Sequence, residues 1–331
     1  MVTVLLTGVG GAAGIGAIGS LRRTTDHEVV GVDMDPEAAG LFIADAAAQV
    51  PPAAADGWVD TMVRIVRQHA VDVIVPTVDE ELPRLPELRA ALPEVGIVAP
   101  RQEVIEVARD KYRTSRVLRE AGHDVPRTWL GTAVDEVPDD AYPLIGKPRT
   151  GRGSRGIERL DTPADLDTFL AAADDLDAVV VQERIDGPEY TTSVVTTGDG
   201  RLIGIVPKEA IEKQGSTVRG VTRRAPAVDA ACRGIHETLD PAGPINVQQI
   251  LSEGTAYTIE INPRFSSTAC LTVAAGVDEL DLLIRDAAGE TVESTGDYES
   301  GTHLIRYLDH VIVDEGRLEH TADGSPMEPT Q

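Results

Sequence analysis

Lysine is almost missing from this chain, and acidic residues far outnumber basic ones. The 331 residues include 55 Asp and Glu against 30 Lys and Arg, which gives a formal net charge of −25 at pH 7. A field of this sign repels phosphate backbones, so the sequence predicts no general nucleic-acid binding. Dispersed acids with so little Lys are typical of proteins from salt-loving organisms. Each remaining Lys is therefore a candidate for a specific role, and the four are Lys111, Lys147, Lys208 and Lys213.

Cysteine and long apolar runs are also scarce. Cys232 and Cys270 form no CxxC or Cys/His pattern, so we expect buried thiols rather than a zinc site. No stretch approaches the roughly 18 uninterrupted apolar residues of a membrane span. The first residues, MVTVLLTGVGG, lack the basic region of a signal peptide. We therefore expect a cytoplasmic protein without a membrane span, with a length that suits about two domains.

The first hundred residues alternate apolar, β-branched runs with helical patterns. Strands are predicted at 2–7, 28–33 and 71–76, and a helix at 58–69. This alternation is typical of a parallel sheet covered by helices on both faces. The sequence therefore predicts an α/β, Rossmann-like N-terminal domain that ends near residue 100.

From residue 101 onward, the pattern changes to short strands in antiparallel pairs. A single helix is expected over 101–121. Another is expected over 162–173, because Thr162, Pro163 and Asp165 provide an N-cap, a first-turn proline and an acid at the third position. These elements predict an α+β fold. Its strands are expected at 142–148, 157–160, 178–184, 190–197, 202–206, 245–251 and 257–262.

The last two of these strands place polar side chains on one face. If the strands pair with Gln248 opposite Glu260, the period of two gathers five oxygen-bearing side chains. Such groups suit Mg²⁺ or Mn²⁺ rather than zinc. A hairpin whose polar face meets water is the alternative, but Arg264 in the next turn favours a metal–phosphate site. The polar face would present Asn246, Gln248, Thr258, Glu260 and Asn262.

A glycine-rich loop follows one of the four Lys residues. Lys147 ends a predicted strand, and RTGRGSRG comes soon after it. Glycines let backbone N–H groups approach phosphate oxygens, and the Lys supplies positive charge. Because the Lys precedes the glycines, this is not a Walker A loop; a hairpin without function is the alternative. The loop residues predicted to close over phosphates are Gly151, Gly153, Ser154 and Gly156.

A third polar group follows the apolar run AVVV. Gln182 and Glu183 end this strand, and Glu189 follows Gly187. Backbone groups of such a strand can line a base, and a carboxylate can bind ribose hydroxyls. Acids are abundant in this chain, so this pattern alone favours an ordinary surface strand.

Together these segments resemble the ATP-grasp superfamily, over essentially the whole chain. The E-x-N-P-R element at its distance from N-x-Q is specific, whereas the glycine loop alone is not. The chain is similar to one ATP-grasp unit of the carbamoyl phosphate synthase large subunit and to related stand-alone ligases. The matching segments, in order, are Asp110-Lys111, Lys147-Pro148, Val181-Gln182-Glu183, Asn246-Val247-Gln248 and Glu260-Ile261-Asn262-Pro263-Arg264.

The resemblance implies a domain plan. A Rossmann-like pre-ATP-grasp domain would occupy residues 1–100, followed by an ATP-grasp domain at 101–290 that includes a small lid subdomain at about 125–185. Residues 291–331 would form a C-terminal extension whose end is expected to be flexible.

The resemblance also implies residue roles, with ATP and Mg²⁺ (or Mn²⁺) as cofactors. Lys111 and Lys147 would contact the phosphates from two lobes, and Glu189 would bind the ribose. Arg264 and Lys147 are the implied catalytic residues, with Arg264 stabilising the transferring phosphoryl group. The glycine loop would close over the phosphates. Gln182, Glu183 and Ile185 would complete the nucleotide site, and Gln248, Glu260 and Asn262 would hold the metal.

The implied reaction activates a small-molecule carboxylate as an acyl phosphate, which an amine then attacks. Phosphoryl transfer needs positioning and charge neutralisation more than covalent catalysis, so no conspicuous nucleophile is required. The resemblance also allows a homodimer. Expected substrate contacts from the N-terminal domain are Gly8–Gly16, the segment after Asp33 and Thr77–Glu81, with the last as a site for an ammonium group or a helix cap. From the other side they are Lys208, Lys213, Arg219 and Ser266–Thr268.

Two other functions fit parts of the sequence. In an NAD(P)-dependent oxidoreductase, the turn TGVGGAAGIG and Asp33 would bind the dinucleotide, but the E-x-N-P-R strand and the glycine hairpin would have no role. An ATP-binding subunit or module related to carbamoyl phosphate synthesis is the second. The chain has one ATP-grasp unit where the synthase has two, and Gln248 stands where many ATP-grasp ligases have an acid.

Overall fold

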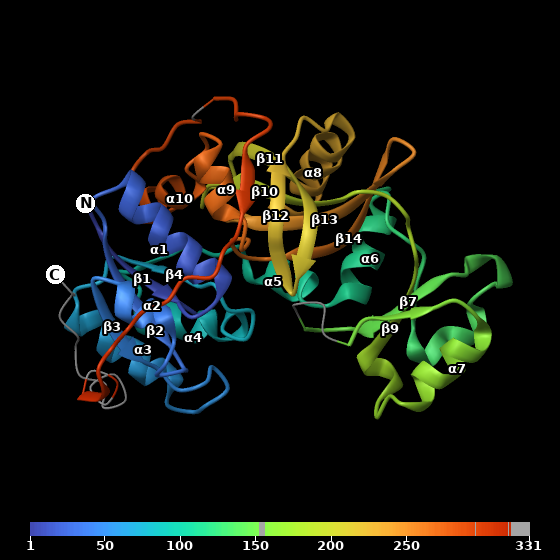
Figure 1. Ribbon diagram of the computed structural model, residues 1–331, viewed down its shortest axis with the longest axis horizontal. Helices are drawn as coiled ribbons and strands as arrows, with labels where there is room; N and C mark the ends of the chain where they lie inside the picture. Colours follow the sequence, from blue (N-terminus) through green and yellow to red (C-terminus); the bar gives the residue numbers. More distant parts are fainter. Residues whose placement is uncertain (152–155, 295, 317, 319–331) are drawn as a thin grey trace.

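The computed structural model describes residues 1–151, 156–294, 296–316 and 318, and it arranges them around three sheets (Figure 1). A parallel sheet lies at one end of the molecule and a small antiparallel sheet at the other. A large antiparallel sheet lies between them. Within these residues, no helix combines the length and apolar character needed to cross a membrane.

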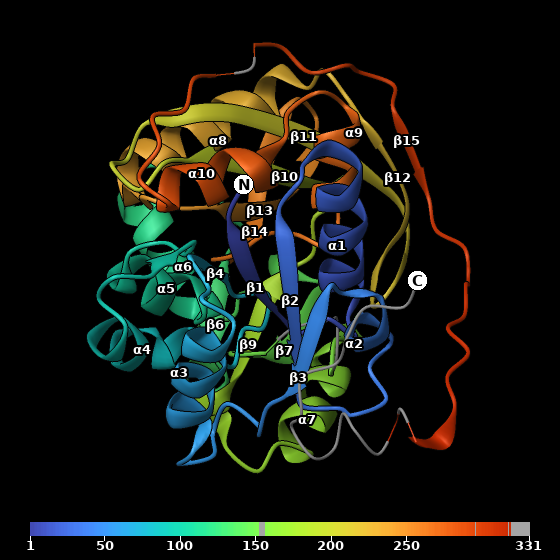
Figure 2. The same cartoon turned by 90° about the vertical axis from the view of Figure 1, so that its left-hand side faces the viewer.

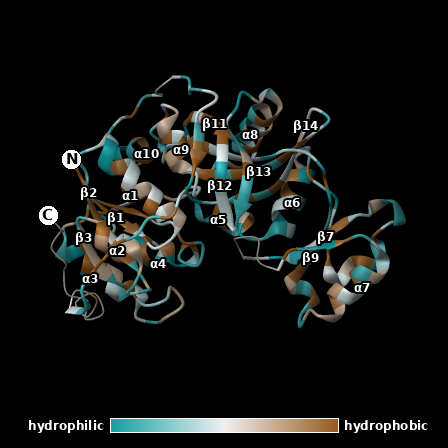
Figure 3. Ribbon diagram, viewed as in Figure 1, coloured by the Kyte–Doolittle hydropathy of each residue, from teal (hydrophilic) through white to brown (hydrophobic). Residues whose placement is uncertain are grey.

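The N-terminal sheet is parallel, with strand order β3-β2-β1-β4-β5, so the predicted α/β Rossmann-like domain is confirmed. Its central strands are apolar and buried on both faces, as their hydrophobic colouring in Figure 3 illustrates. The strands are β1 Thr3–Thr7, β2 Glu28–Asp33, β3 Ala46–Gln49, β4 Val73–Val75 and β5 Gly96–Ile97. The helices are α1 Ala12–Thr24, α2 Ala39–Ile43, α3 Trp58–Gln68, the 3-10 turn η1 Leu82–Arg84 and α4 Leu85–Ala91.

The single helix expected over 101–121 is wrong, because the structure has two helices there. They are α5 (Gln102–Ala108) and α6 (Lys111–Glu120). Asp110 leaves the helical conformation and its side chain accepts the Arg113 N–H at 3.0 Å, so it is the N-cap of α6. The break places Lys111 at the first position of a new helix.

The small sheet is antiparallel, with strand order β6-β9-β7-β8. One face packs on α7 through an apolar cluster that includes Leu144, Leu166 and Phe169. Its strands are β6 Thr128–Leu130, β7 Leu144–Pro148, β8 Glu158–Leu160 and β9 Val179–Glu183, its helix is α7 Pro163–Ala171, and its 3-10 turns are η2 Gly131–Glu136, η3 Asp139–Ala141 and η4 Leu176–Ala178.

The predicted helix start at Thr162 is confirmed, with both hydrogen bonds of a capping box between Thr162 and Asp165. Thr162→Ala removes the hydroxyl that accepts the Asp165 N–H, so we expect α7 to lose about 1 kcal/mol of stability. Amide hydrogen exchange of α7 measures this loss. Thr168→Ala is the control, because the exposed Thr168 hydroxyl bonds only within the helix, to Ala164 O. Equal exchange in both variants would contradict the cap.

The large sheet is antiparallel, with strand order β14-β13-β10-β11-β12-β15. Helix α8 covers one face, and α9 and α10 lie against the N-terminal domain, where both contact α1 (Figure 2). Ile18 and Leu21 of α1 share one apolar core with Leu280 and Ile284 of α10, which joins the two domains. The elements are β10 Glu189–Thr196, β11 Leu202–Gln214, β12 Ser216–Thr222, α8 Pro226–Leu239, β13 Ile245–Ser252, β14 Thr255–Asn262, α9 Ala269–Ala274, α10 Glu279–Ala287 and β15 His303–Ile305.

The predicted register of β13 and β14 is confirmed, with Gln248 opposite Glu260. The assignment of Thr258 to the same face is wrong. A bulge after Gln248 shifts the pairing, so that Thr258 lies opposite Gln249 and accepts its side-chain N–H at 3.3 Å. An extra residue in one strand reverses the alternation beyond it. Thr258 is therefore buried on the opposite face of the hairpin.

The C-terminal segment returns along the molecule. Strand β15 pairs with β12 and forms one edge of the large sheet (Figure 1). Most of the chain end that we expected to be flexible, residues 319–331, lies outside the described residues.

Candidate active site

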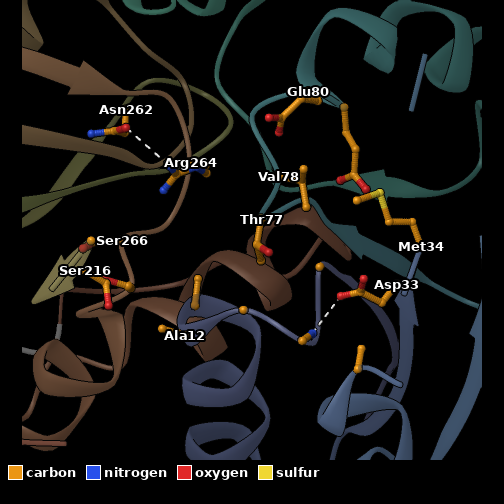
Figure 4. A pocket seen from close by; sticks show the side chains of 18 of the residues that line it. Ala12, Asp33, Met34, Thr77, Val78, Glu80, Ser216, Asn262, Arg264 and Ser266 are labelled. Carbon is orange, nitrogen blue, oxygen red and sulfur yellow. Dashed lines mark hydrogen bonds between the residues drawn. The ribbon is translucent and has the colours of Figure 1, made fainter. Parts of the chain in front are cut away.

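A cavity of about 810 Å³ opens between the N-terminal domain and the large sheet (Figure 4). One wall consists of the segments that follow β1, β2, β3 and β4, and the facing wall includes residues of β10, β13 and β14, the end of β11 and the start of β12. The loops at the carboxyl ends of parallel strands are the usual ligand contacts of such a sheet. The polar side chains that line it include Asp33, Thr77, Glu80, Thr191, Lys213, Ser216, Asn246, Gln248, Glu260, Asn262, Arg264 and Ser266.

The three predicted metal ligands lie on this cavity. Gln248 pairs with Glu260, and Asn246 pairs with Asn262 two residues further along the hairpin. All four side chains line the cavity wall. The Thr191 hydroxyl donates to Asn246 Oδ1 at 2.8 Å, and Arg264 Nη2 donates to Asn262 Oδ1 at 3.3 Å, so each amide oxygen keeps one of its two lone pairs for a cation. A carboxylate flanked by two amide oxygens fits a hard divalent cation. The donor set therefore fits Mg²⁺ or Mn²⁺.

Lys111 links the predicted metal face to the glycine loop. Its ammonium lies 3.5 Å from Glu260 Oε1 and donates to the Gly151 carbonyl at 2.8 Å. The preceding residue, Asp110, receives two hydrogen bonds from Arg149, at 2.6 and 2.9 Å. Burial opposes the charged form of Asp110, but Arg149 and the helix N–H groups together hold the pKa of this carboxyl below its ordinary value. The start of α6 and the loop are thus fixed to each other.

Lys147 is buried on the small sheet, with only 6% of its surface exposed. Its ammonium donates to Gln182 Oε1 at 2.8 Å, and the Gln182 amide donates to Thr128 Oγ1 at 2.9 Å. Burial lowers the pKa of Lys147 to about 8. The negative charge of Glu260 opposes this shift, and the positive charge of Lys111 adds to it. Lys147 therefore lies within electrostatic reach of both Glu260 and Lys111.

The glycine loop connects β7 and β8. Gly151 and Gly156 have φ values of +112° and +67°, a region that favours glycine. Gly153 and Ser154 lie outside the described residues. The loop therefore leaves and enters its strands through the two turns that its glycines allow.

The other predicted nucleotide residues follow the end of the same sheet. Glu183 accepts two hydrogen bonds from Arg127, both at 3.2 Å, so its carboxylate is held by that guanidinium. Ile185 lies in the connection from β9 to β10. Glu189 begins β10 and accepts from Lys213 at 2.6 Å. Because Lys213 lines the cavity, this pair connects the predicted ribose contact to the cavity wall.

On the opposite wall, the glycine turn after β1 is packed too closely for larger residues. A Cβ on Gly14 would come within 2.6 Å of Gly8 O and Val9 Cα. Asp33, the expected ribose ligand of an oxidoreductase, instead accepts the Gly10 N–H at 2.7 Å (Figure 4). The acid and the turn N–H are thus engaged with each other. Close packing accounts for Gly14, and Asp33 has a structural role in the turn that does not require a dinucleotide.

Two of the expected substrate contacts are wrong. Lys208 is fully buried and does not line the cavity; it donates to Ser193 Oγ at 2.5 Å and Thr272 Oγ1 at 2.7 Å. The helices α9 and α10 cover it. Arg219 lies at the surface, 3.4 Å from Glu212. Rarity of Lys and nearness in the sequence did not reveal which side chains α9 and α10 cover.

Sequence reasoning missed the contacts that orient the site. Arg264 forms a two-pronged ion pair with Asp79, at 2.6 and 3.0 Å, across 185 residues. The Thr191–Asn246 bond and the Arg149–Asp110 pair were also missed. Asp79 was noted in a loop after a strand, but no local pattern indicated its partner.

Two segments of the chain match known protein families. Residues 108–268 match an ATP-grasp domain, and residues 4–99 match a PylC-like N-terminal domain. The carbamoyl phosphate synthase large chain of Thermoanaerobacter sp. (strain X514) is 28% identical over 226 residues, which are 62% of this chain and 21% of that protein. The chain thus aligns with about a fifth of the length of this curated relative.

Solved structures share the fold. N5-carboxyaminoimidazole synthetase from Staphylococcus aureus, complexed with ADP, has a TM-score of 0.70 at 17% identity and covers 88% of this chain and 79% of its own. An L-amino acid ligase from Bacillus licheniformis has a TM-score of 0.66 at 17% identity and covers 89% and 75%. The chain therefore contains an ATP-grasp domain at residues 108–268, preceded by a PylC-like N-terminal domain at residues 4–99.

Proposed function

We propose that this protein is an ATP-dependent, ADP-forming ligase that joins a small-molecule carboxylate to an amine. The observation that supports it most is the position of Lys111. Its ammonium bridges Glu260 on the metal face and Gly151 on the glycine loop, so the two halves of a nucleotide site meet at one cation. The loops of the N-terminal domain face the same cavity and leave room for a second substrate.

The residues of the site would each help to neutralise the negative charge of ATP and of the reacting groups. Lys147 and Lys111 would neutralise the phosphates of ATP, and Arg264 would stabilise the transferring phosphoryl group. Gln248, Glu260 and Asn262 would hold Mg²⁺, which when bound neutralises phosphate oxygens. This arrangement supplies positive charge where the reaction builds negative charge.

The chemistry would proceed in two displacements. A carboxylate oxygen of the first substrate would attack the γ-phosphorus, the bond to the β-phosphate oxygen would break, and ADP would leave. The amine nitrogen would then attack the acyl carbon, and inorganic phosphate would leave with the bonding electrons. Loss of one proton from nitrogen gives the amide. Each step is a transfer between bound groups, for which positioning within the cavity provides much of the rate.

The amine would approach from the N-terminal wall. Glu80 and Glu81 both line the cavity there, and Glu81 is the more buried of the two, with a carboxylate that accepts the Thr7 hydroxyl at 2.5 Å. A carboxylate on this wall suits a substrate that arrives as an ammonium ion. Glu80 is therefore the residue we assign to amine recognition.

A panel of amino acids and other carboxylates, each incubated with Mg-ATP and an amine, tests the proposal. Mass spectrometry should show a condensed product, and ADP should appear only when both substrates are present. ADP release that depends on no added acid or amine would favour an ATP-binding module instead. Thermal stabilisation by NADH or NADPH but not by Mg-ATP would support the oxidoreductase. Light scattering on the same samples measures whether the protein is a homodimer.

A further inference from the structure

The guanidinium of Arg264 is held by protein oxygens on several sides. Asp79 accepts from Nε at 3.0 Å and from Nη2 at 2.6 Å, Asn262 Oδ1 accepts from Nη2 at 3.3 Å, and the Phe265 carbonyl accepts from Nη1 at 3.1 Å. An Arg side chain has five N–H bonds in a rigid plane. Among the described residues, four of them have an acceptor, and one N–H of Nη1 is left. The orientation of that last donor is therefore determined by the other four.

The Arg264–Asp79 pair is largely removed from water. The side chains are 13% and 16% exposed. Two parallel hydrogen bonds between a guanidinium and a carboxylate give directional control that a single ion pair does not. Asp79 contributes both bonds of the fork, so it has the largest share in fixing the plane of the guanidinium.

Asp79 lies in the loop that faces the cavity from the N-terminal domain. Its neighbours Val78 and Glu80 line the cavity, and so does Arg264, to which the Asp79 carboxylate is bonded (Figure 4). A ligand that contacts Val78 or Glu80 therefore touches the same short segment that orients Arg264. The position of the loop and the orientation of the guanidinium are coupled.

The pair is not needed to keep the two domains together. Helix α1 already shares an apolar core with α9 and α10, and this core includes Ile18, Leu280 and Ile284. A buried core of that kind contributes more to attachment than one ion pair, whose Coulombic attraction is largely offset by the cost of removing both charges from water. The bidentate geometry therefore points to orientation rather than attachment.

We propose that Asp79 is a positioning residue that orients Arg264 and couples this orientation to the substrate loop at residues 77–81. The direction in which Arg264 acts, toward the transferring phosphoryl group, rests on the proposed ligase function. The control of the Arg264 orientation by Asp79 does not depend on that function. Occupancy of the amine side of the cavity would thus be transmitted to the phosphoryl-transfer side through one carboxylate.

Arginine NMR tests the orientation without any nucleotide. The Nε–H resonance of Arg264, assigned by its loss in Arg264→Lys, should exchange slowly with water in the wild type. In Asp79→Asn it should exchange at least about tenfold faster, because the fork is lost. Glu87→Gln is the matched control, since it breaks the bidentate Arg84–Glu87 pair outside the cavity. An unchanged Arg264 resonance in Asp79→Asn overturns the proposal.

Steady-state ADP release tests the consequence. Asp79→Asn should lower kcat about 10- to 100-fold, as loss of an orienting partner commonly does. KM for Mg-ATP should stay within about threefold, since the interaction acts mainly in the transition state. Asp79→Glu should restore part of the rate, because it keeps the carboxylate.

A double-mutant cycle separates positioning from a general defect. Asp79→Asn should add little to Arg264→Lys if both act through the same guanidinium. Fully additive losses would overturn the proposal even if each single variant is slow. If the wild type forms no ADP with any acid and amine, the proposed function fails, while the NMR result still decides whether Asp79 orients Arg264.

Discussion

Replacing Glu260 by Gln is expected to lower metal-dependent ADP formation by about 1,000-fold. Glu260 supplies the only full negative charge among the three predicted metal donors, and Gln keeps its size and one oxygen. Loss of a metal's charge stabilisation is worth several kcal/mol, which corresponds to a factor of this order. ADP release measured over a series of Mg²⁺ concentrations checks the result.

Binding of Mn²⁺ provides a measurement that needs no turnover. Electron paramagnetic resonance of Mn²⁺ with a non-hydrolysable ATP analogue should show much weaker binding in Glu260→Gln than in the wild type. Glu253→Gln is the control, because Glu253 lies exposed at the tip of the same hairpin. Equal Mn²⁺ affinity in Glu260→Gln and the wild type would show that the metal face is misassigned.

The hairpin behind this prediction was accessible from the sequence because its pairing is local. A short turn brings β13 and β14 together, and period two then places Gln248 and Glu260 on one face. The bulge could not be predicted, since nothing in the sequence after Gln248 indicates that β14 contains one additional residue. Thr258 was misplaced for that reason alone. A pattern of period two holds only up to the first irregularity in a strand.

The contacts between domains were not predictable from local patterns. Arg264 contacts Asn262, as its position two residues along the chain suggests, but its partner Asp79 belongs to another domain, 185 residues away. Lys208 shows the opposite failure. Because Lys is rare in this acidic chain, Lys208 was expected to contact a substrate, yet α9 and α10 cover its side chain. Sequence spacing identifies which side chains share a strand face, while tertiary packing decides which of them reach the cavity.

One contact that the sequence could not reveal weakens the oxidoreductase alternative. The spacing between the glycine turn and Asp33 is compatible with an oxidoreductase as well as with an ATP-dependent ligase. In this fold the Asp33 carboxylate accepts the Gly10 N–H, so the group expected to bind ribose is engaged by the turn itself. The same residues therefore serve the shape of the cavity wall.

Lys147→Met is expected to stabilise the nucleotide-free protein by about 2 kcal/mol at neutral pH and to weaken Mg-ATP binding at least about 100-fold. Burial lowers the pKa of Lys147 from 10.5 to about 8. Keeping this ammonium charged in the folded state therefore costs about 3 kcal/mol. Removing the ammonium abolishes this cost, but the variant also loses the hydrogen bond to Gln182, which contributes about 1 kcal/mol. The net stabilisation is therefore about 2 kcal/mol. The affinity falls because the removed charge is the one that would neutralise phosphate.

The stability difference has a pH dependence of known sign. Between about pH 8 and 10.5 the unfolded chain holds the Lys147 proton and the folded chain does not, so wild-type stability rises with pH across this window. Lys147→Met lacks this rise, so its advantage is full below pH 8 and changes to a deficit of about 1 kcal/mol above pH 10.5, where only the lost hydrogen bond remains. Urea unfolding at pH 7 and pH 10, with calorimetric titration of Mg-ATP, measures both effects. Lys147→Arg, which keeps the charge, should bind Mg-ATP more tightly than Lys147→Met. If Lys147→Met instead binds Mg-ATP like the wild type, Lys147 is only a buried structural cation and does not bind phosphate.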